Sequence, residues 1–146
     1  MSQAYYDANY LFKLQCVENG TSEVRAHAAT VNILCIAAHG RAEYASAAFR
    51  KVREGSATPS DYQLAIAQVK ADAATGNLKF LPLTETILNR VEQVFATAPA
   101  TTFLRAADAL HLATAAEHGF TEIHSNDKHL LAAAPLFGLV GVNVIP

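Results

Sequence analysis

Ile33-Leu34-Cys35-Ile36-Ala37 is apolar at every position and rich in residues that favour strands. Such a run is typical of a strand in a parallel sheet whose two faces are both covered, because no face remains for polar side chains. His39 and Gly40 follow, and a helical pattern then extends from about Arg41 to Glu54. The stretch therefore predicts one strand and helix unit of an α/β fold.

The same alternation continues on both sides of that run. Further strands are expected at residues 4–6, 79–83, 121–124 and 139–145, and further helices at residues 9–17, 22–32, 58–75, 84–97, 104–118 and 128–134. Alternating elements predict a parallel sheet with helices on both faces. We therefore expect residues 1–146 to form a single domain, a three-layer α/β/α sandwich with a mostly parallel central sheet.

Composition excludes several classes of protein. Hydrophobic residues make up 51% of the chain and charged residues 16%, which excludes a disordered chain. A net charge of -2 offers no broad basic surface for nucleic acid. The two cysteines, Cys16 and Cys35, form neither a zinc ribbon nor a disulfide framework. Because the chain shows no signal peptide and no apolar run of the roughly 18–20 residues that a membrane helix needs, we expect a reduced, cytoplasmic protein that does not contact a membrane.

Four acidic residues occupy positions where parallel sheets bind ligands. Asp7 follows the first expected strand and Asp127 the fourth, whereas Glu43 and Asp108 lie in the first turns of two helices. These positions can converge beyond the carboxyl ends of the strands. Two carboxylates about 5 Å apart repel each other by roughly 3 kcal/mol at an effective dielectric constant near 20, so such a cluster requires a cation or protonation. Oxygen ligands suit Mg²⁺ or Mn²⁺.

Each of these acids also has a simpler interpretation. Asp7 and Asp127 could each cap the helix that follows. Glu43 and Asp108 could complement the positive end of a helix dipole. Spacing alone does not decide between these roles and a metal site.

Four short motifs carry a more specific signal, and they lie in order along nearly the whole chain. They are Tyr6-Asp7-Ala8-Asn9, Arg41-Ala42-Glu43-Tyr44, Leu104-Arg105-Ala106-Ala107-Asp108-Ala109-Leu110-His111-Leu112-Ala113 and Ser125-Asn126-Asp127-Lys128-His129-Leu130. Together they resemble the motifs of PIN-domain proteins of the VapC type, the toxins of toxin–antitoxin pairs. Ser125 stands where threonine is commoner in that family, and it keeps the hydroxyl group.

The resemblance implies a metal-dependent endoribonuclease that cleaves RNA phosphodiester bonds. Its catalytic and metal-binding residues would be Asp7, Glu43, Asp108 and Asp127, with Mg²⁺ or Mn²⁺ as the cofactor. The resemblance also implies a small cognate antitoxin protein and a homodimer. Tyr44 is expected, with Phe49, to line a groove for a helix of the antitoxin. No motif indicates which RNA is cleaved.

Three further side chains are candidates for supporting roles. Asn9 and Ser125 are expected to orient the carboxylates or water, although capping or turn roles stay open. Arg105, three residues before Asp108, is expected to hold that carboxylate or contact phosphate, and an ordinary helix ion pair stays open.

The basic residues and histidines allow more than one interpretation. Arg50, Lys51 and Arg53 are candidates for a basic rim that guides RNA, or form a solvated helix face. His111 is expected to be a structural residue, with a general-base role as the alternative. The remaining histidines show no zinc-binding spacing and are expected to be structural or exposed: His27, His39, His118, His124 and His129.

Two rival functions remain open. The first is a catalytically inactive PIN-like module that binds RNA or protein. The second is another α/β enzyme, such as a metal-dependent phosphatase or a nucleotide-binding enzyme. Asn9 interrupts the D-x-D pattern that a phosphatase would place after the first strand, and the chain has no glycine-rich phosphate-binding motif.

Overall fold

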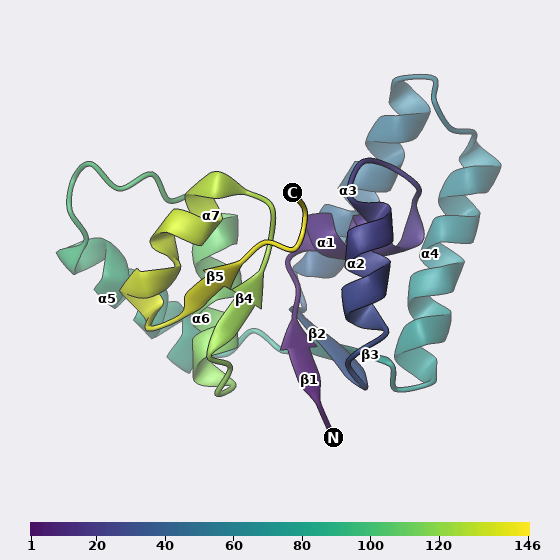
Figure 1. Cartoon of the computed structure of the whole chain (residues 1–146). Coiled ribbons are helices and arrows are strands. Elements are labelled where there is room, and N and C mark those ends of the chain that lie inside the picture. Colours follow the sequence, from purple (N-terminus) through teal and green to yellow (C-terminus); the bar gives the residue numbers. More distant parts are fainter.

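Strands and helices alternate along the chain in the order that the sequence predicts. The computed structural model describes residues 1–146 (Figure 1). Its strands are β1 (Gln3–Tyr5), β2 (Ile33–Ala37), β3 (Leu78–Leu81), β4 (Glu122–His124) and β5 (Val140–Val142). Its helices are α1 (Ala8–Gln15), α2 (Thr21–Ala28), α3 (Gly40–Arg53), α4 (Pro59–Ala74), α5 (Glu85–Thr97), α6 (Ala106–Glu117), α7 (Lys128–Ala133) and the short 3-10 helix η1 (Ala134–Phe137).

All strand pairs are parallel, and the sheet consists of two pieces. One piece has the order β1-β2-β3, and the other pairs β4 with β5. The pieces meet where Tyr6 and His124 form an isolated parallel bridge, and the N–H group of Asp7 donates to the carbonyl oxygen of His124 at 3.1 Å. The strand order across the molecule is therefore β3-β2-β1-β4-β5, with a narrow junction between β1 and β4.

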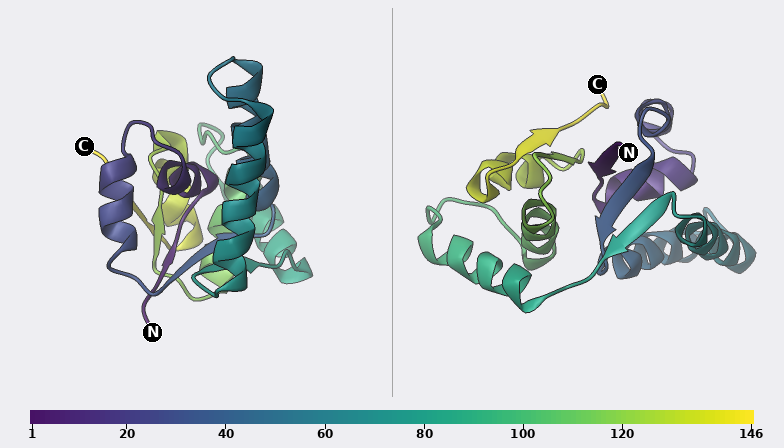
Figure 2. Two further views of the ribbon diagram at one scale, coloured as in Figure 1. Left: turned by 90° about the vertical axis from the view of Figure 1, so that its right-hand side faces the viewer. Right: turned by 90° about the horizontal axis from the view of Figure 1, so that it is seen from below.

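Successive side chains of the central strands enter two different cores, because side chains alternate between the faces of a strand. Tyr5 and Cys35 pack into the core formed with α5, α6 and α7. Tyr6, Leu34 and Ile36 pack into the core formed with α1, α2, α3 and α4. The two groups of helices lie on opposite sides of the strands (Figures 1 and 2), and the predicted three-layer α/β/α fold is confirmed.

Helix α3 begins close to strand β2, at Gly40. A Cβ atom at Gly40 would lie 2.5 Å from Cδ1 of Ile36 and 3.5 Å from Cε1 of His111. Only glycine avoids the first of these clashes. Gly40 thereby allows the first turn of α3 to lie against the end of β2, and Glu43 in that turn reaches His111 of α6 through its side chain.

Several sequence-based expectations differ from the structure. Helix α2 ends at Ala28 rather than at residue 32, and β5 covers Val140–Val142 rather than residues 139–145. Helix α6 begins at Ala106 rather than at residue 104, and Arg105 is its N-cap residue with an extended backbone. Tyr44 is not an exposed groove residue, because its side chain is buried and its ring centre lies 5.7 Å from that of Phe12. Phe49 is exposed as expected. None of the helices combines the length and the apolar character needed to cross a bilayer.

Candidate active site

Asp7 connects the carboxyl ends of β1 and β4. Its side chain is buried, and its Oδ1 accepts the N–H group of Tyr10 at 3.0 Å, which caps α1. Its Oδ2 accepts the hydroxyl group of Ser125 at 2.5 Å. The Ser125 hydroxyl oxygen in turn accepts the N–H group of Asp127 at 2.9 Å. A continuous hydrogen-bonded path therefore joins two of the predicted site acids across the junction of the sheet.

The environment of Asp7 disfavours its negative charge. Burial raises the pKa of Asp7 from 3.8 to about 6, although the hydrogen bonds from Ser125 and Tyr10 act in the opposite direction. The negative charge of Glu43 raises this pKa further. A buried carboxylate in these surroundings is stabilised when a cation binds next to it.

Asp108 and Asp127 share a positive neighbour. Nε of Arg105 lies 3.6 Å from Oδ2 of Asp108, and its Nη2 lies 3.7 Å from Oδ2 of Asp127. Oδ1 of Asp127 accepts the N–H groups of His129 and Leu130, so Asp127 also caps α7. The Arg105 side chain is 67% exposed, and ion pairs of such mobile, solvated groups are weak. One arginine therefore compensates this pair of carboxylates only in part.

Oδ2 of Asp108 lacks a hydrogen-bond donor, although Nε of Arg105 lies 3.6 Å away. This oxygen is buried. Burial and the nearby charge of Asp127 raise the pKa of Asp108. A buried acceptor without a partner costs about 1–3 kcal/mol, which a bound cation would offset. The acids near Asp108 offer further oxygen atoms, which are ligands that suit hard divalent ions. The three side chains whose possible ligand atoms all lie within 4.8 Å of one another are His39, Glu43 and His111.

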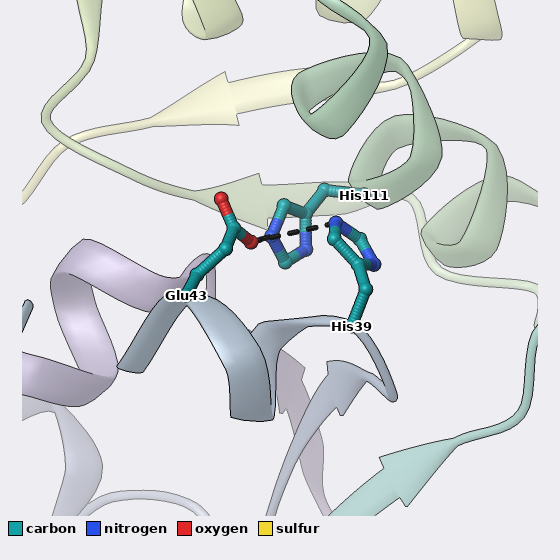
Figure 3. A group of neighbouring side chains, drawn as sticks. All are labelled: His39, Glu43 and His111. Atoms are coloured by element: carbon teal, nitrogen blue, oxygen red, sulfur yellow. Dashed lines mark hydrogen bonds and ion pairs between the residues drawn. The ribbon is translucent and has the colours of Figure 1, made fainter. Parts of the chain in front are cut away.

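Glu43 lies beside two histidines, His39 and His111 (Figure 3). Its Oε1 is 2.5 Å from Nε2 of His111 and 3.4 Å from Nε2 of His39. Burial would raise the pKa of Glu43, but the hydrogen bond and positive charge of His111 outweigh it, and the pKa is lowered. The charge of Glu43 also acts on both Asp7 and Asp108. Glu43 is therefore the anionic residue that links the acidic residues to the histidines.

Tyr5 fixes His111 from the opposite side. The Tyr5 hydroxyl group lies 2.7 Å from Nδ1 of His111 and accepts the N–H group of Ala37 at 3.0 Å. His111 is 1% exposed and holds its two ring nitrogens against Tyr5 and Glu43. The structural role predicted for His111 agrees with this position.

The structure places the four predicted acids at one edge of the sheet, and it also supports the simpler interpretation of two of them. Asp7 and Asp127 both cap helices, yet each keeps a second oxygen directed to Ser125 or Arg105. Ser125 and Arg105 thus contact the acids as expected. Asn9 is exposed, with no hydrogen bond to the acids.

His39 lies beside Glu43, although it was expected from the sequence to be structural or exposed and unconnected with the site. His39 lies four residues before Glu43, and residues at this spacing face each other on a helix surface. This spacing is the signal that would have identified it.

A groove runs from Glu43 along α1 and α3. It encloses about 380 Å³ and is lined by seven residues: Ala8, Asn9, Ala42, Glu43, Ser46, Ala47 and Arg50. Of the three basic residues considered for a guiding rim, only Arg50 lines it. Lys51 instead lies 3.8 Å from Glu18. The groove therefore joins one basic side chain to the acidic site.

Comparisons with known proteins identify relatives of the whole fold. The PIN domain model matches residues 4–135. The crystal structure of FitAcB from Neisseria gonorrhoeae is similar, with a TM-score of 0.73, 15% identity and coverage of 97% of each chain. A structure of FitAB bound to an IR36 DNA fragment gives a TM-score of 0.68 at 17% identity, covering 98% of this chain and 96% of that one. No curated protein matches in sequence.

Proposed function

The chain belongs to the PIN domain family, and on that premise we propose that it is a metal-dependent endoribonuclease that hydrolyses RNA phosphodiester bonds. Asp7, Glu43, Asp108 and Asp127 would hold Mg²⁺ or Mn²⁺. The observation that carries the proposal is the buried Oδ2 atom of Asp108, which lacks a hydrogen-bond partner beside other acids. A carboxylate that only complemented the α6 dipole would be expected to have a hydrogen-bond donor at this buried oxygen, beyond the ion pair with Arg105 at 3.6 Å.

The bound ion would activate water and offset the negative charge of the phosphodiester group. The chain's own residues prepare the site for this chemistry. Ser125 fixes the orientation of the Asp7 carboxylate, and the capping bond to Tyr10 prevents its rotation. His111 holds Glu43 in its anionic form through a short hydrogen bond.

RNA would approach along the groove that contains Arg50. A net charge of -2 gives the protein no general attraction for a polyanion, so local positive charge must guide the strand. Arg50 lines the groove that leads to Glu43, and Arg105 is exposed beside Asp108 and Asp127. These two arginines are the basic side chains best placed to contact phosphate groups.

We further propose that the protein is the toxin of a type II, VapBC-like pair, neutralised by a small antitoxin. The likeness to FitAcB, which extends over 97% of both chains, supports this idea. We also expect a homodimer, because α5 and its flanking segments expose large apolar side chains that a partner would cover: Leu83, Leu88, Phe95 and Phe103. Light scattering on the purified protein would test the homodimer, and co-purification with the product of an adjacent short reading frame would test the antitoxin.

Cleavage assays with purified protein test the nuclease directly. We expect RNA cleavage that EDTA abolishes and Mn²⁺ restores. Asp108→Asn should reduce the rate by about 100-fold or more, because it removes charge where the reaction needs it. The exposed variant Glu122→Gln is the matched control and should cleave at the wild-type rate. Unchanged cleavage by Asp108→Asn, or binding of RNA without cleavage under all metal conditions, would instead support an inactive binding module.

A further inference from the structure

Two histidines join Glu43 in a cluster that differs in chemistry from the acidic residues. His39, Glu43 and His111 each direct one potential ligand atom toward the others, and these atoms all lie within 4.8 Å of one another (Figure 3). The cluster joins the start of α3 to α6, so elements far apart in sequence build it. It contains two nitrogen ligands and one oxygen ligand, whereas Asp7, Asp108 and Asp127 offer only oxygen.

We propose that His39, Glu43 and His111 form a second metal site, which binds a borderline divalent transition ion such as Zn²⁺ and withdraws Glu43 from the acidic site. Imidazole nitrogen favours zinc, nickel and copper ions, whereas carboxylate oxygen alone suits Mg²⁺ and Mn²⁺. Two imidazoles and one carboxylate are a ligand set that zinc accepts while it keeps a fourth position for water.

The observed distances suit this ligand set. With metal–ligand distances of 2.0–2.1 Å, tetrahedral zinc separates its ligand atoms by roughly 3.3 Å. Nε2 of His39 and Oε1 of Glu43 are already 3.4 Å apart. Nε2 of His111 lies 2.5 Å from the same oxygen and needs to separate from it by less than 1 Å, a displacement that the flexible Glu43 side chain allows.

The surroundings of His111 provide the support that metal-binding imidazoles need. Such a histidine usually donates its second N–H group to a fixed acceptor. The Tyr5 hydroxyl oxygen lies 2.7 Å from Nδ1 of His111 and is itself held by the N–H group of Ala37. When zinc binds Nε2, Nδ1 carries the proton and donates a hydrogen bond to the Tyr5 hydroxyl oxygen.

His39 makes the site selective. Its Nε2 lies 3.0 Å from the carbonyl oxygen of Ala107, a hydrogen bond that must break when this nitrogen binds a metal. Mg²⁺ binds imidazole weakly and does not compensate this loss, whereas Zn²⁺ does. Asp7 and Asp108 lie close enough for their charges to act on His111, and they add a negative field that attracts the cation.

Zinc titrations of the intact, metal-stripped protein by calorimetry test the site without any RNA. We expect about one Zn²⁺ per chain, with affinity reduced about tenfold or more in His39→Ala and by about tenfold in Tyr5→Phe. His118→Ala is the control: His118 is an exposed histidine at the C-terminal end of α6, away from the cluster in sequence, and its variant should bind zinc like the wild type. Circular dichroism of each variant verifies its fold.

A second pair of measurements separates the two sites. Asp108→Asn should reduce Mn²⁺ affinity strongly, yet change Zn²⁺ affinity by less than about threefold, because Asp108 acts on zinc only through its charge. Equal zinc binding by wild type and His39→Ala would overturn the proposal. So would loss of zinc binding in Asp108→Asn, or no zinc binding at micromolar concentration.

The zinc site would also inhibit RNA cleavage by withdrawing Glu43. This expectation rests on the proposed nuclease function, whereas the zinc site itself does not. Zn²⁺ added to the Mg²⁺-dependent reaction should inhibit RNA cleavage, and half-inhibition of His39→Ala should require about tenfold more zinc, relative to its own uninhibited rate. Equal sensitivity of the two proteins would contradict the withdrawal of Glu43. If no RNA is cleaved under any condition, the nuclease proposal fails, while the zinc titrations still decide whether the site exists.

Discussion

Replacing Asp7 by Asn should stabilise the metal-free protein, although it removes a residue of the proposed active site. Asparagine caps helices as well as aspartate does, so the bond from the Tyr10 N–H group is kept. Its amide N–H can donate to the Ser125 hydroxyl oxygen, which now donates to Asp7. The substitution therefore preserves the shape of the site and removes its buried charge.

The magnitude follows from the pKa of Asp7, which burial raises from 3.8 to about 6. Folded protein then binds more protons than unfolded protein between these values, so the free energy of unfolding falls as the pH rises from about 4 to 6. Two pKa units at about 1.4 kcal/mol each give a loss of roughly 3 kcal/mol at pH 7 and above. Asp7→Asn has no charge to bury and does not lose this free energy, so its midpoint of thermal unfolding should lie about 6–12 °C above that of the wild type.

Urea unfolding in EDTA at pH 7.5 and pH 5 provides the assay. The variant should exceed the wild type by roughly 3 kcal/mol at pH 7.5 and by about half of that at pH 5, where Asp7 is mostly protonated in the folded state. Mn²⁺ should then raise the midpoint of the wild type and leave that of the variant nearly unchanged. Asp61→Asn is a matched control, because Asp61 is fully exposed, its pKa is lowered by bonds to Thr58, and no stabilisation is expected.

A variant that is less stable than the wild type in EDTA at pH 7.5 would refute this reasoning. So would a stability difference that does not narrow between pH 7.5 and pH 5. Either result would mean that Asp7 is stabilised by interactions within the protein rather than destabilised by its burial.

Three further substitutions have expected outcomes. Ser125→Ala removes the hydroxyl that donates to Asp7 and accepts from Asp127, so NMR titration should show a higher Asp7 pKa, and urea unfolding should show a loss of about 1–3 kcal/mol. Gly20→Ala places a Cβ atom 2.5 Å from Cδ1 of Ile145 at a φ of 91°, and should lower the free energy of unfolding by about 2–4 kcal/mol. Gly55→Ala is the control, because Gly55 has a similar φ and open space around it, and should lower it by about 1 kcal/mol. Equal losses in the two variants would refute the clash. Thr58→Ala removes the capping box of α4 and should cost about 1 kcal/mol, measured by the same method.

Local patterns predicted most of the fold, because local interactions determine most of its elements. The apolar run at residues 33–37 forms β2, and Thr58 and Thr84 begin α4 and α5 as caps. The junction between β1 and β4 was not predictable, because the length of strand pairing depends on how two distant pieces pack. The start of α6 also differed, since Arg105 has an extended backbone as the N-cap residue.

The candidate site was predictable in its acids and not in its histidines. Parallel topology alone brings the residues after strands to one edge, so Asp7 and Asp127 could be placed from the sequence. The contact of His39 and Glu43 with His111 depends instead on how side chains at the start of α3 reach α6 across the end of β2. A contact between side chains of elements so far apart in the sequence leaves no local pattern in it.

The weakest part of the sheet coincides with the proposed metal site, and this coincidence links stability to activity. Between β1 and β4 only the bridge at Tyr6 and His124 continues the sheet, and the next side chains along the two strands are Asp7 and Ser125. The bond between them closes the junction, but it does so with a carboxylate whose charge burial disfavours. A cation that neutralises this charge would therefore strengthen the junction at the same position where it supports catalysis. The metal-free protein therefore has a lower free energy of unfolding than it would have with an uncharged residue at this position. This loss of stability comes from Asp7, a residue that the proposed reaction requires.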